Sequence, residues 1–433
     1  MIFLAPALVF AVMFILKIPA VAGISDPLQT TSLALGFILI FAFLFGKITY
    51  RFKLPQITGF ILAGIICGPF LFGFLSRNDV QDLQLLDGLA LSLIALTAGG
   101  EMRIKDLRGR LKTIGLLTLF QTVLIIAGFI ALGLVLRTVV PFFAGHTITQ
   151  VFVFALLLGT LATATSPSTT IAIINETKAK GRYTDLILST AVVKDFFVIT
   201  LFAFSLSFSK SLLSPKQGFD LGFLLHILRD VGGSILIGLA VGGGLILYLK
   251  YIRKDIAIFI LGIAFFTYQI SHHEGFHPLM ICLVAGFIVE NFSSQGDKLI
   301  KAIERSSLPV YVVFFAISGA SINLDALRTT WYLAVIFVIW RAVLKFAGTY
   351  AGARLAGEDR GIRSRSWAGF ISQAGVALGM AVIIDRTFPE WGDMFKTLVL
   401  AIIALNQILG PILLQRLLIS AGESGRKVTG SSQ

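Results

Sequence analysis

Long apolar stretches, separated by short polar and basic loops, fill almost the whole chain. Most of them run for about 20 residues, which is the length that an α-helix needs to cross the hydrocarbon core of a bilayer. The pattern predicts helices over residues 2–24, 31–50, 54–74, 83–101, 112–140, 148–175, 185–209, 220–249, 255–271, 277–292, 308–323, 331–356, 363–385 and 396–419. We therefore expect an all-α polytopic membrane protein with thirteen, or with the first stretch fourteen, transmembrane helices.

The first apolar stretch, within residues 1–30, allows two interpretations. MIFLAPALVFAVMF lacks the basic n-region of a signal peptide, yet IPAVAG places small residues near a plausible cleavage point. We favour an extra membrane helix slightly over a cleaved signal peptide. The remaining helices keep the same orientation in either case.

Composition supports the membrane interpretation. Hydrophobic residues make up 56% of the chain and charged residues 14%, and the mean hydropathy is +0.89. Soluble domains contain about 45–50% apolar and about 25% charged residues. Cys67 and Cys282 both fall in predicted spans and suggest neither a disulfide framework nor a metal site. No Walker motif and no hydrolytic constellation is present, so we expect neither an enzyme nor a cofactor.

The basic residues are concentrated in alternate loops. The loops near residues 50, 108, 180, 253, 301 and 360 and the C-terminal tail hold most of the Lys and Arg outside the spans. The positive-inside rule places these loops and the C-terminus in the cytoplasm, with the chain in the cell (inner) membrane. This asymmetry accounts for the net charge of +13, so a nucleic-acid partner is not expected.

Two pairs of segments resemble each other in the same order. LPQITGFILAGIICGPF (54–70) resembles FHPLMICLVAGFIVENF (276–292), and LTAGGEMRIKDLR (96–108) resembles ISGASINLDALR (317–328). The simple alternative is that small residues and prolines align easily in apolar sequence. The repeat interpretation predicts two inverted six-helix repeats over 31–209 and 255–419, a linker helix within 210–254, and a short cytoplasmic tail over 420–433.

One helix in each half is expected to break. In LATATSPSTTIAIINE (161–176), Pro167 removes a backbone N–H and disfavours helix at Ser166, beside Thr165. In GFISQAGVALGMAV (369–382), glycines including Gly375 weaken the helix around Ser372 and Gln373. The simple alternative is a proline kink plus glycines for close packing. At matching repeat positions, we favour two broken helices whose hydroxyl and carbonyl oxygens could bind a cation.

A cation and an anion stand together in the middle of a predicted span. The stretch from Asp185 to Phe208 contains no charge between its ends except Lys194 and Asp195. Because a charged side chain is costly inside a bilayer, an intramembrane acid is a functional-site hypothesis by default.

TATSPSTT (163–170), VVKD (192–195) and LKFAGTYAGARLAG (344–357) together resemble the monovalent cation/proton antiporters. The resemblance is closest to the Kef-type and NapA-type sodium or potassium/proton exchangers, the cation/proton antiporter 2 branch. It implies a crossed pair of broken helices, a homodimer and an elevator-like movement of a core domain. It also implies that Asp195 binds the ion and that Lys345 is the basic residue of the late helix.

The chain departs from that family at the residue before Asp195. Electrogenic members carry Asp-Asp and electroneutral members Asn-Asp, whereas this chain has Lys194. Either Lys345 turns to Asp195, or one of the two lysines is neutral. Arg341 lies one helical turn before Lys345 and is equally consistent with a structural pairing, to Glu290 or Asp87, as with a functional role.

The sequence therefore predicts a secondary transporter that exchanges Na⁺ or K⁺ for protons at Asp195, with 1:1 electroneutral stoichiometry. Two alternatives remain open. The first is a proton-coupled anion transporter, which the local excess of positive charge would favour. The second is a channel-like or transport-inactive protein in which Lys194 occupies the cation site.

Overall fold

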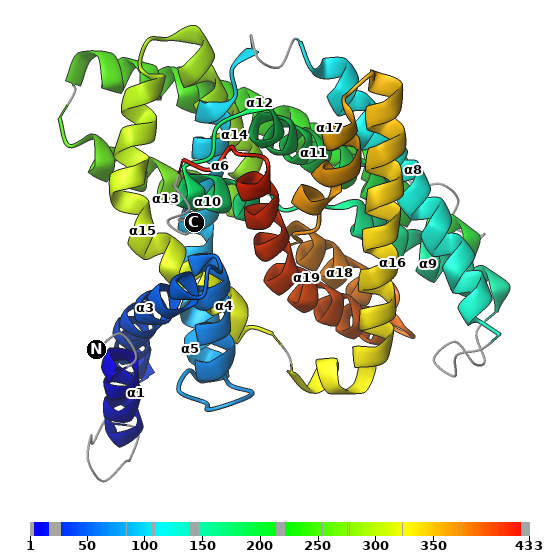
Figure 1. The fold of residues 1–433 in the computed structure, drawn as a ribbon, viewed down its shortest axis with the longest axis horizontal. Coiled ribbons are helices and arrows are strands. Elements are labelled where there is room, and N and C mark those ends of the chain that lie inside the picture. The colour runs from blue at the N-terminus through cyan, green and yellow to red at the C-terminus, as the bar shows by residue number, and fades with distance from the viewer. Residues whose placement is uncertain are drawn as a thin grey trace, which may run out of the picture. The chain divides into compact units, whose positions relative to one another are not determined.

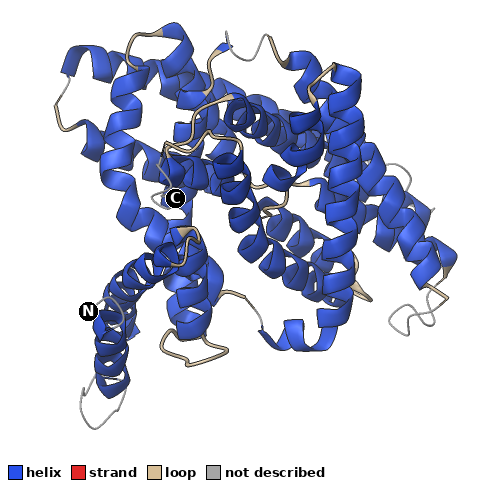
Figure 2. Ribbon diagram, in the orientation of Figure 1, coloured by secondary structure: helices blue, strands red, loops and turns tan. Residues whose placement is uncertain are grey.

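A computed structural model of the chain describes residues 4–16, 27–83, 85–104, 109–138, 147–213, 221–252, 254–274, 276, 278–322, 324–373 and 375–425. Throughout these residues the regular elements are helices, and none is a strand (Figure 2). Seven described helices are long and apolar enough to cross a membrane, or eight if the bent pair over 77–83 and 88–100 forms one span. The expected all-α class is confirmed, whereas the count of thirteen or fourteen spans stays a prediction.

The chain divides into two compact units, and each takes segments from both halves of the sequence. Unit 1 comprises Met1–Arg103, Ile171–Glu176 and Ser234–Asp325. Unit 2 comprises Ile104–Thr170, Thr177–Gly233 and Ala326–Gln433. Both units therefore depend on contacts between residues that are far apart in sequence. The junction between the first apolar stretch and the second helix, at 17–26, lies outside the described residues.

Unit 1 is a bundle built around two helix pairs. Its helices are α1 (Leu4–Leu16), α3 (Pro27–Arg51), α4 (Gln56–Cys67), α5 (Arg77–Leu83), α6 (Leu85–Glu101), the end of α12 (Leu221–Leu247), η3 (Tyr248–Ile252), α13 (Ile256–Glu274), α14 (Pro278–Phe292) and α15 (Gly296–Ala320). The labels are those of Figure 1. Helix α4 packs against α15, and α6 packs against α14.

Both pairs approach so closely that only glycine fits at the contact. A Cβ atom added at Gly64 of α4 would overlap the carbonyl oxygen of Ala316 in α15. A Cβ atom added at Gly286 of α14 would overlap the carbonyl oxygen of Leu96 in α6. In a bilayer the hydrophobic effect does not drive helices together, because lipid is as apolar as their side chains. Membrane helices therefore rely on close van der Waals contact, which small residues allow.

Unit 2 contains the long helices that carry the intramembrane charges. Its elements are α8 (Leu111–Leu136), α9 (Ile148–Thr163), α10 (Pro167–Thr177, in part), α11 (Arg182–Leu213), the start of α12, α16 (Leu324–Ala356), α17 (Arg360–Arg365), η4 (Ser366–Phe370), α18 (Gly375–Thr387) and α19 (Gly392–Ser420). One apolar core joins α8, α9, α16, α18 and α19. Within it Phe129 stacks on Phe337 at 5.6 Å between ring centroids, and Phe154 meets Phe395 edge-on at 4.9 Å. This core holds the shorter, interrupted helices in place.

The close approach of α4 and α15 generates a stability prediction. Gly64→Ala should lower the free energy of unfolding by about 1–3 kcal/mol, because the added methyl group forces the two backbones apart. Gly115→Ala is the matched control: Gly115 lies in α8 with open space around its Cα, so alanine there should be neutral or slightly stabilising. Thermal unfolding of both purified variants in detergent measures the difference. Equal transition temperatures for the two variants would contradict the contact.

Candidate functional site

Two helices of unit 2 are interrupted at the places that the sequence suggested. Helix α9 ends before residues 164–166, which are not helical, and α10 begins at Pro167. Proline suits this first helical position because its missing N–H would have no partner there. Element η4 likewise ends before residues 371–373, and α18 begins at Gly375.

The two interruptions contact each other directly. The backbone N–H of Ser166 donates a hydrogen bond of 2.9 Å to the carbonyl oxygen of Ser372. The hydroxyl of Thr165 donates to the carbonyl oxygen of Phe370 at 3.4 Å. The hydroxyl of Ser166 accepts from the N–H of Thr169 at 3.2 Å and so caps the first turn of α10. The structure thus brings together Thr165, Ser166 and Ser372, three of the residues expected to bind the ion. We call this contact the crossover.

Gln373 anchors the crossover to the neighbouring helices. Its amide nitrogen donates to the carbonyl oxygen of Leu161 at 2.9 Å, and its amide oxygen accepts from the side chain of Asn406 in α19 at 2.8 Å. Sequence reasoning did not select Asn406, although an amide inside the apolar stretch 396–419 is a usable signal. Two buried oxygen atoms here, the hydroxyl of Ser372 and the amide oxygen of Asn406, have no partner among the described residues.

Arg341 joins both interruptions. Its side chain is fully buried, and its guanidinium donates to the carbonyl oxygens of Ala162 at 2.8 Å, Ala164 at 2.7 Å and Ile371 at 2.7 Å. Glu290, one of the two suggested partners, accepts from the Nε of Arg103 at 2.7 Å within unit 1, whereas the partners of the Arg341 guanidinium are carbonyl oxygens of unit 2. The side chain of Asp87, the other suggested partner, lies outside the described residues. Arg341 therefore binds backbone oxygens where the sequence suggested a carboxylate.

Lys345 binds the same helix end from one turn further along α16. Its ammonium donates to the carbonyl oxygen of Thr163 and to the hydroxyl of Thr165, both at 2.9 Å. The C-terminal end of a helix carries unpaired carbonyl groups and a partial negative charge, which a cation offsets. Arg341 and Lys345 therefore satisfy the end of α9 together, and the pairing of Lys345 with Asp195 is not formed.

Lys194 lies next to this group of cations. It is fully buried, donates to the amide oxygen of Gln121 in α8, and stands 5.9 Å above the ring of Phe370. Its amino group also lies close to that of Lys345. The amide nitrogen of Gln121 donates in turn to Thr349 of α16 at 2.8 Å. Gln121 was missed at the sequence level because nothing local distinguishes it from a lipid-facing polar residue.

Asp195 differs from the basic residues around it. Its side chain is half-buried, and within the described part of the chain its carboxylate has no hydrogen-bond or ion-pair partner. Consecutive side chains on a helix diverge by about 100°, so Asp195 does not share the contacts of Lys194. A carboxylate inside an apolar span and without a cationic partner can bind a proton or a metal cation.

The contacts of Arg341 predict a large loss of stability on its removal. Arg341→Met should lower the free energy of unfolding by about 3 kcal/mol or more, because several buried carbonyl groups lose their donor at once. Arg360→Met is the matched control, since Arg360 is exposed at the start of α17. Thermal unfolding in detergent compares the two variants. An Arg341 variant as stable as the Arg360 variant would show that the carbonyl groups do not depend on the guanidinium.

The chain resembles known sodium/proton antiporters over almost its whole length. The family described as "Sodium/hydrogen exchanger, transmembrane" matches residues 35–420. The chain is 26% identical over 396 residues to the Na⁺/H⁺-K⁺ antiporter GerN of Bacillus cereus, covering 88% of this chain and 94% of GerN. It is 22% identical over 392 residues to the probable Na⁺/H⁺ antiporter 3 of Methanocaldococcus jannaschii, covering 88% of this chain and 95% of that protein.

The fold is that of a solved antiporter. A structure of the sodium proton antiporter MjNhaP1 from Methanocaldococcus jannaschii aligns with a TM-score of 0.69 and 20% identity, over 94% of this chain and 99% of that one. A second structure of MjNhaP1, at pH 8, aligns with a TM-score of 0.64 and 18% identity over 92% and 100%. The expected group of monovalent cation/proton antiporters is confirmed. The narrower assignment to the Kef-type and NapA-type branch is corrected, because the matching family is that of the sodium/hydrogen exchangers.

Proposed function

Because this chain belongs to the sodium/hydrogen exchanger family and spans the membrane several times, we propose that it is a secondary active transporter that exchanges Na⁺ or K⁺ for protons. The observation that carries this proposal is Asp195. Its carboxylate stands in the middle of an apolar helix, and no basic group among the described residues neutralises it. A group of this kind can alternate between a proton and a metal cation.

The proposed ion site joins Asp195 to the crossover. A deprotonated Asp195 binds a dehydrated cation together with oxygen atoms of Thr165, Ser166, Ser372 and Gln373. The unpartnered hydroxyl of Ser372 supports this assignment, because it is buried and free to turn its lone pairs to a cation. A proton competes for the same carboxylate, so the elevator-like movement takes place only when one of the two ligands is bound.

The packing of unit 1 supports two inverted repeats over 31–209 and 255–419. Helices α4 and α14 come from one pair of similar segments, and α6 and α15 come from the other. Each helix packs on a helix from the other half of the chain and from the other pair of similar segments: α4 packs on α15, and α14 packs on α6. An approximate twofold relation between the halves produces this reciprocal pairing. With the twelve repeat helices, the linker helix within 210–254 gives thirteen proposed spans and the extra helix within 1–30 gives fourteen, while residues 420–433 form a cytoplasmic tail.

The transporter is proposed to be a homodimer in the cell (inner) membrane, with the C-terminus in the cytoplasm. Basic residues in alternate loops support this orientation. The dimer rests on the family membership alone.

We propose 1:1 electroneutral exchange, with Lys194 as a fixed internal counter-charge. The Lys194 ammonium is held by Gln121 and by the face of Phe370, and it does not contact the carboxylate that takes the ion. It therefore stays in place while Asp195 exchanges its ligand. A carrier with one exchangeable site then moves one charge in each direction per cycle.

One observation favours a second candidate, a proton-coupled anion transporter. Lys194, Arg341 and Lys345 are all fully buried at or beside the crossover, and among the described residues none of them is bound to a carboxylate. A transport-inactive or channel-like protein, in which the Lys194 ammonium takes the place of the cation, has the same support. Reconstituted protein with an imposed pH gradient distinguishes the three, because only an exchanger couples the proton flux to a saturable cation flux.

The exchanger proposal predicts the behaviour of Asp195→Asn. Proteoliposomes that contain this variant should show no proton movement on addition of Na⁺ or K⁺, because the amide cannot take up and release a proton and has no negative charge to balance the cation. The variant should fold as well as the wild type, since it loses a charge that is costly to bury. Asp255→Asn is the matched control, because Asp255 is exposed and asparagine tolerates its positive φ of 44°. Normal exchange by the Asp195 variant, at equal expression, would place the ion site elsewhere.

The counter-charge role predicts the electrical behaviour of the wild type and of Lys194→Asn. Moving one charge across 100 mV involves about 2.3 kcal/mol, and electroneutral exchange avoids this term. The exchange rate of the wild type should therefore be insensitive to voltage, and Lys194→Asn should keep 1:1 stoichiometry with a changed pH optimum. Currents on a solid-supported membrane, recorded beside a dye that reports proton flux, measure both. A sustained net current in the wild type would mean that Lys194 releases its own proton during the cycle.

A further inference from the structure

The end of the described chain folds back onto the start of the ion-carrying helix. Residues 421–425, which follow α19 and which we call the C-terminal strap, run beside the loop that precedes α11. The N–H of Lys180 donates to the carbonyl oxygen of Glu423 at 3.0 Å, and the N–H of Gly425 donates to the carbonyl oxygen of Thr177 at 3.1 Å. Two backbone hydrogen bonds therefore hold the strap, one at Glu423 itself and one two residues further on.

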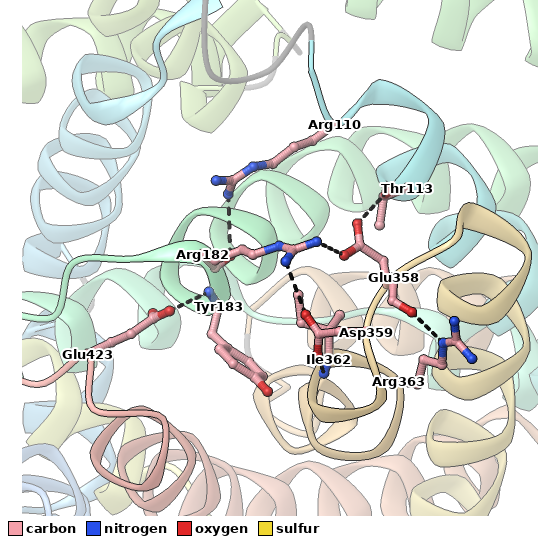
Figure 3. Close-up of polar contacts among 9 residues, drawn as sticks. All are labelled: Arg110, Thr113, Arg182, Tyr183, Glu358, Asp359, Ile362, Arg363 and Glu423. Carbon is pink, nitrogen blue, oxygen red and sulfur yellow. Dashed lines mark hydrogen bonds and ion pairs between the residues drawn. The ribbon is translucent and has the colours of Figure 1, made fainter.

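The carboxylate of Glu423 caps α11. It accepts a hydrogen bond from the N–H of Tyr183 at 2.7 Å (Figure 3). It also accepts from both the N–H and the hydroxyl of Thr184 at 2.8 Å. The first N–H groups of a helix have no partner within the helix, and an anion there also offsets the helix dipole. Such a cap usually comes from a residue just before the helix. Here it comes from the far end of the chain.

Gly181 makes room for this distant cap. Its φ of +153° favours glycine, and a Cβ atom added there would overlap the side chain of Glu423. The local sequence before α11 therefore provides space for the carboxylate of the strap.

The other side of the same helical turn is bound to α8 and α17. Arg182 donates to the carboxylates of Glu358 and, at 3.0 Å, Asp359 (Figure 3). Thr113 at the start of α8 donates to Glu358 at 2.8 Å, and Asp359 caps α17 by accepting from the N–H of Ile362 at 2.9 Å. The first turn of α11 is thus held by carboxylates on two sides. Glu358 and Asp359 bind Arg182, and Glu423 of the strap binds the backbone of Tyr183 and Thr184.

From this geometry we propose that Glu423 is a positioning residue for the ion site, an inference that rests on the proposed exchange at Asp195. Helix α11 is continuous from Arg182 to Leu213, so Asp195 lies roughly 16 Å along a rigid rod from the capped turn. The strap continues α19, which packs on η4 and carries the Asn406 side chain that holds Gln373. Glu423 therefore connects α11, which carries Asp195, to α19, which supports the crossover.

Without the hydrogen bonds of Glu423, the start of α11 is no longer fixed relative to α19. The Asp195 carboxylate and the oxygen atoms of the crossover are then no longer held at fixed positions relative to each other. The first turn of α11 can then open, and the helix can shift along its axis relative to α19. Cation binding needs both sets of oxygen atoms at once, whereas protonation needs only the carboxylate. Removal of the Glu423 carboxylate should therefore weaken binding of the cation and leave the maximal rate at saturating cation unchanged.

The test compares Glu423→Ala, Glu423→Gln and the control Glu304→Ala, whose side chain is exposed on α15, in full-length protein reconstituted into liposomes. We expect the KM for Na⁺ or K⁺ to rise about fivefold in Glu423→Ala, which corresponds to the usual worth of one helix cap, and to rise less in Glu423→Gln, which keeps one acceptor oxygen. Hydrogen exchange of the Tyr183 and Thr184 amides should accelerate by a similar factor. The Glu304 variant should match the wild type in both measurements.

Each outcome decides a separate point. Faster amide exchange with an unchanged KM would make Glu423 a merely structural cap and overturn the positioning role alone. Unchanged amide exchange would overturn the capping contact itself. A wild-type protein without cation/proton exchange would overturn the proposed function, and this inference with it. A Glu423→Gln variant that is folded and shows the graded KM would support the proposal even if Glu423→Ala does not fold.

Discussion

The site depends on how two helix ends inside the protein are satisfied. Helix α9 and element η4 both end near the crossover, where their last carbonyl groups have no helical partner. An unsatisfied carbonyl away from water costs several kcal/mol, so irregular backbone at membrane depth requires donors from the protein. Arg341 and Lys345 provide them, and the same carbonyl oxygens take the place of water around the two cations. Neither the broken helices nor the buried cations would be stable without the other.

This mutual satisfaction explains why Asp195 has no hydrogen-bond or ion-pair partner in the described part of the chain. A lysine on the late helix of such a transporter was expected to turn to the aspartate. In this protein the buried basic groups of Lys194, Arg341 and Lys345 are already bound to Gln121, to backbone oxygen atoms or to Thr165. No described residue neutralises this carboxylate, which supports the proposal that it exchanges a proton for a cation. The polar contact of Gln121 with Thr349 extends the same network to α8 and α16.

The long helix α11 connects this network to the surface of unit 2. Its middle carries Lys194 and Asp195, and its first turn is bound by Glu358, Asp359 and Glu423. Because a helix transmits displacement along its axis, contacts at its first turn bear on the position of the carboxylate. The C-terminal strap of five residues, at the end of the described chain, is therefore part of unit 2.

The sequence alone determined the helical class, the membrane setting, the family and the positions of the two interruptions. Each of these follows from a local property: the length of an apolar stretch, the lost N–H of Pro167, the weak helix propensity around Gly375, and a motif of adjacent residues. The tertiary structure alone decided which groups the charges meet. For Arg341 the sequence allowed either a carboxylate partner or a functional role, and the structure shows it bound to carbonyl oxygens. The contacts of Gln121, Asn406 and Glu423 were not predicted. The physical reason is that a hydrogen-bond partner is set by the packing of segments that can be 240 or more residues apart, which no local pattern encodes.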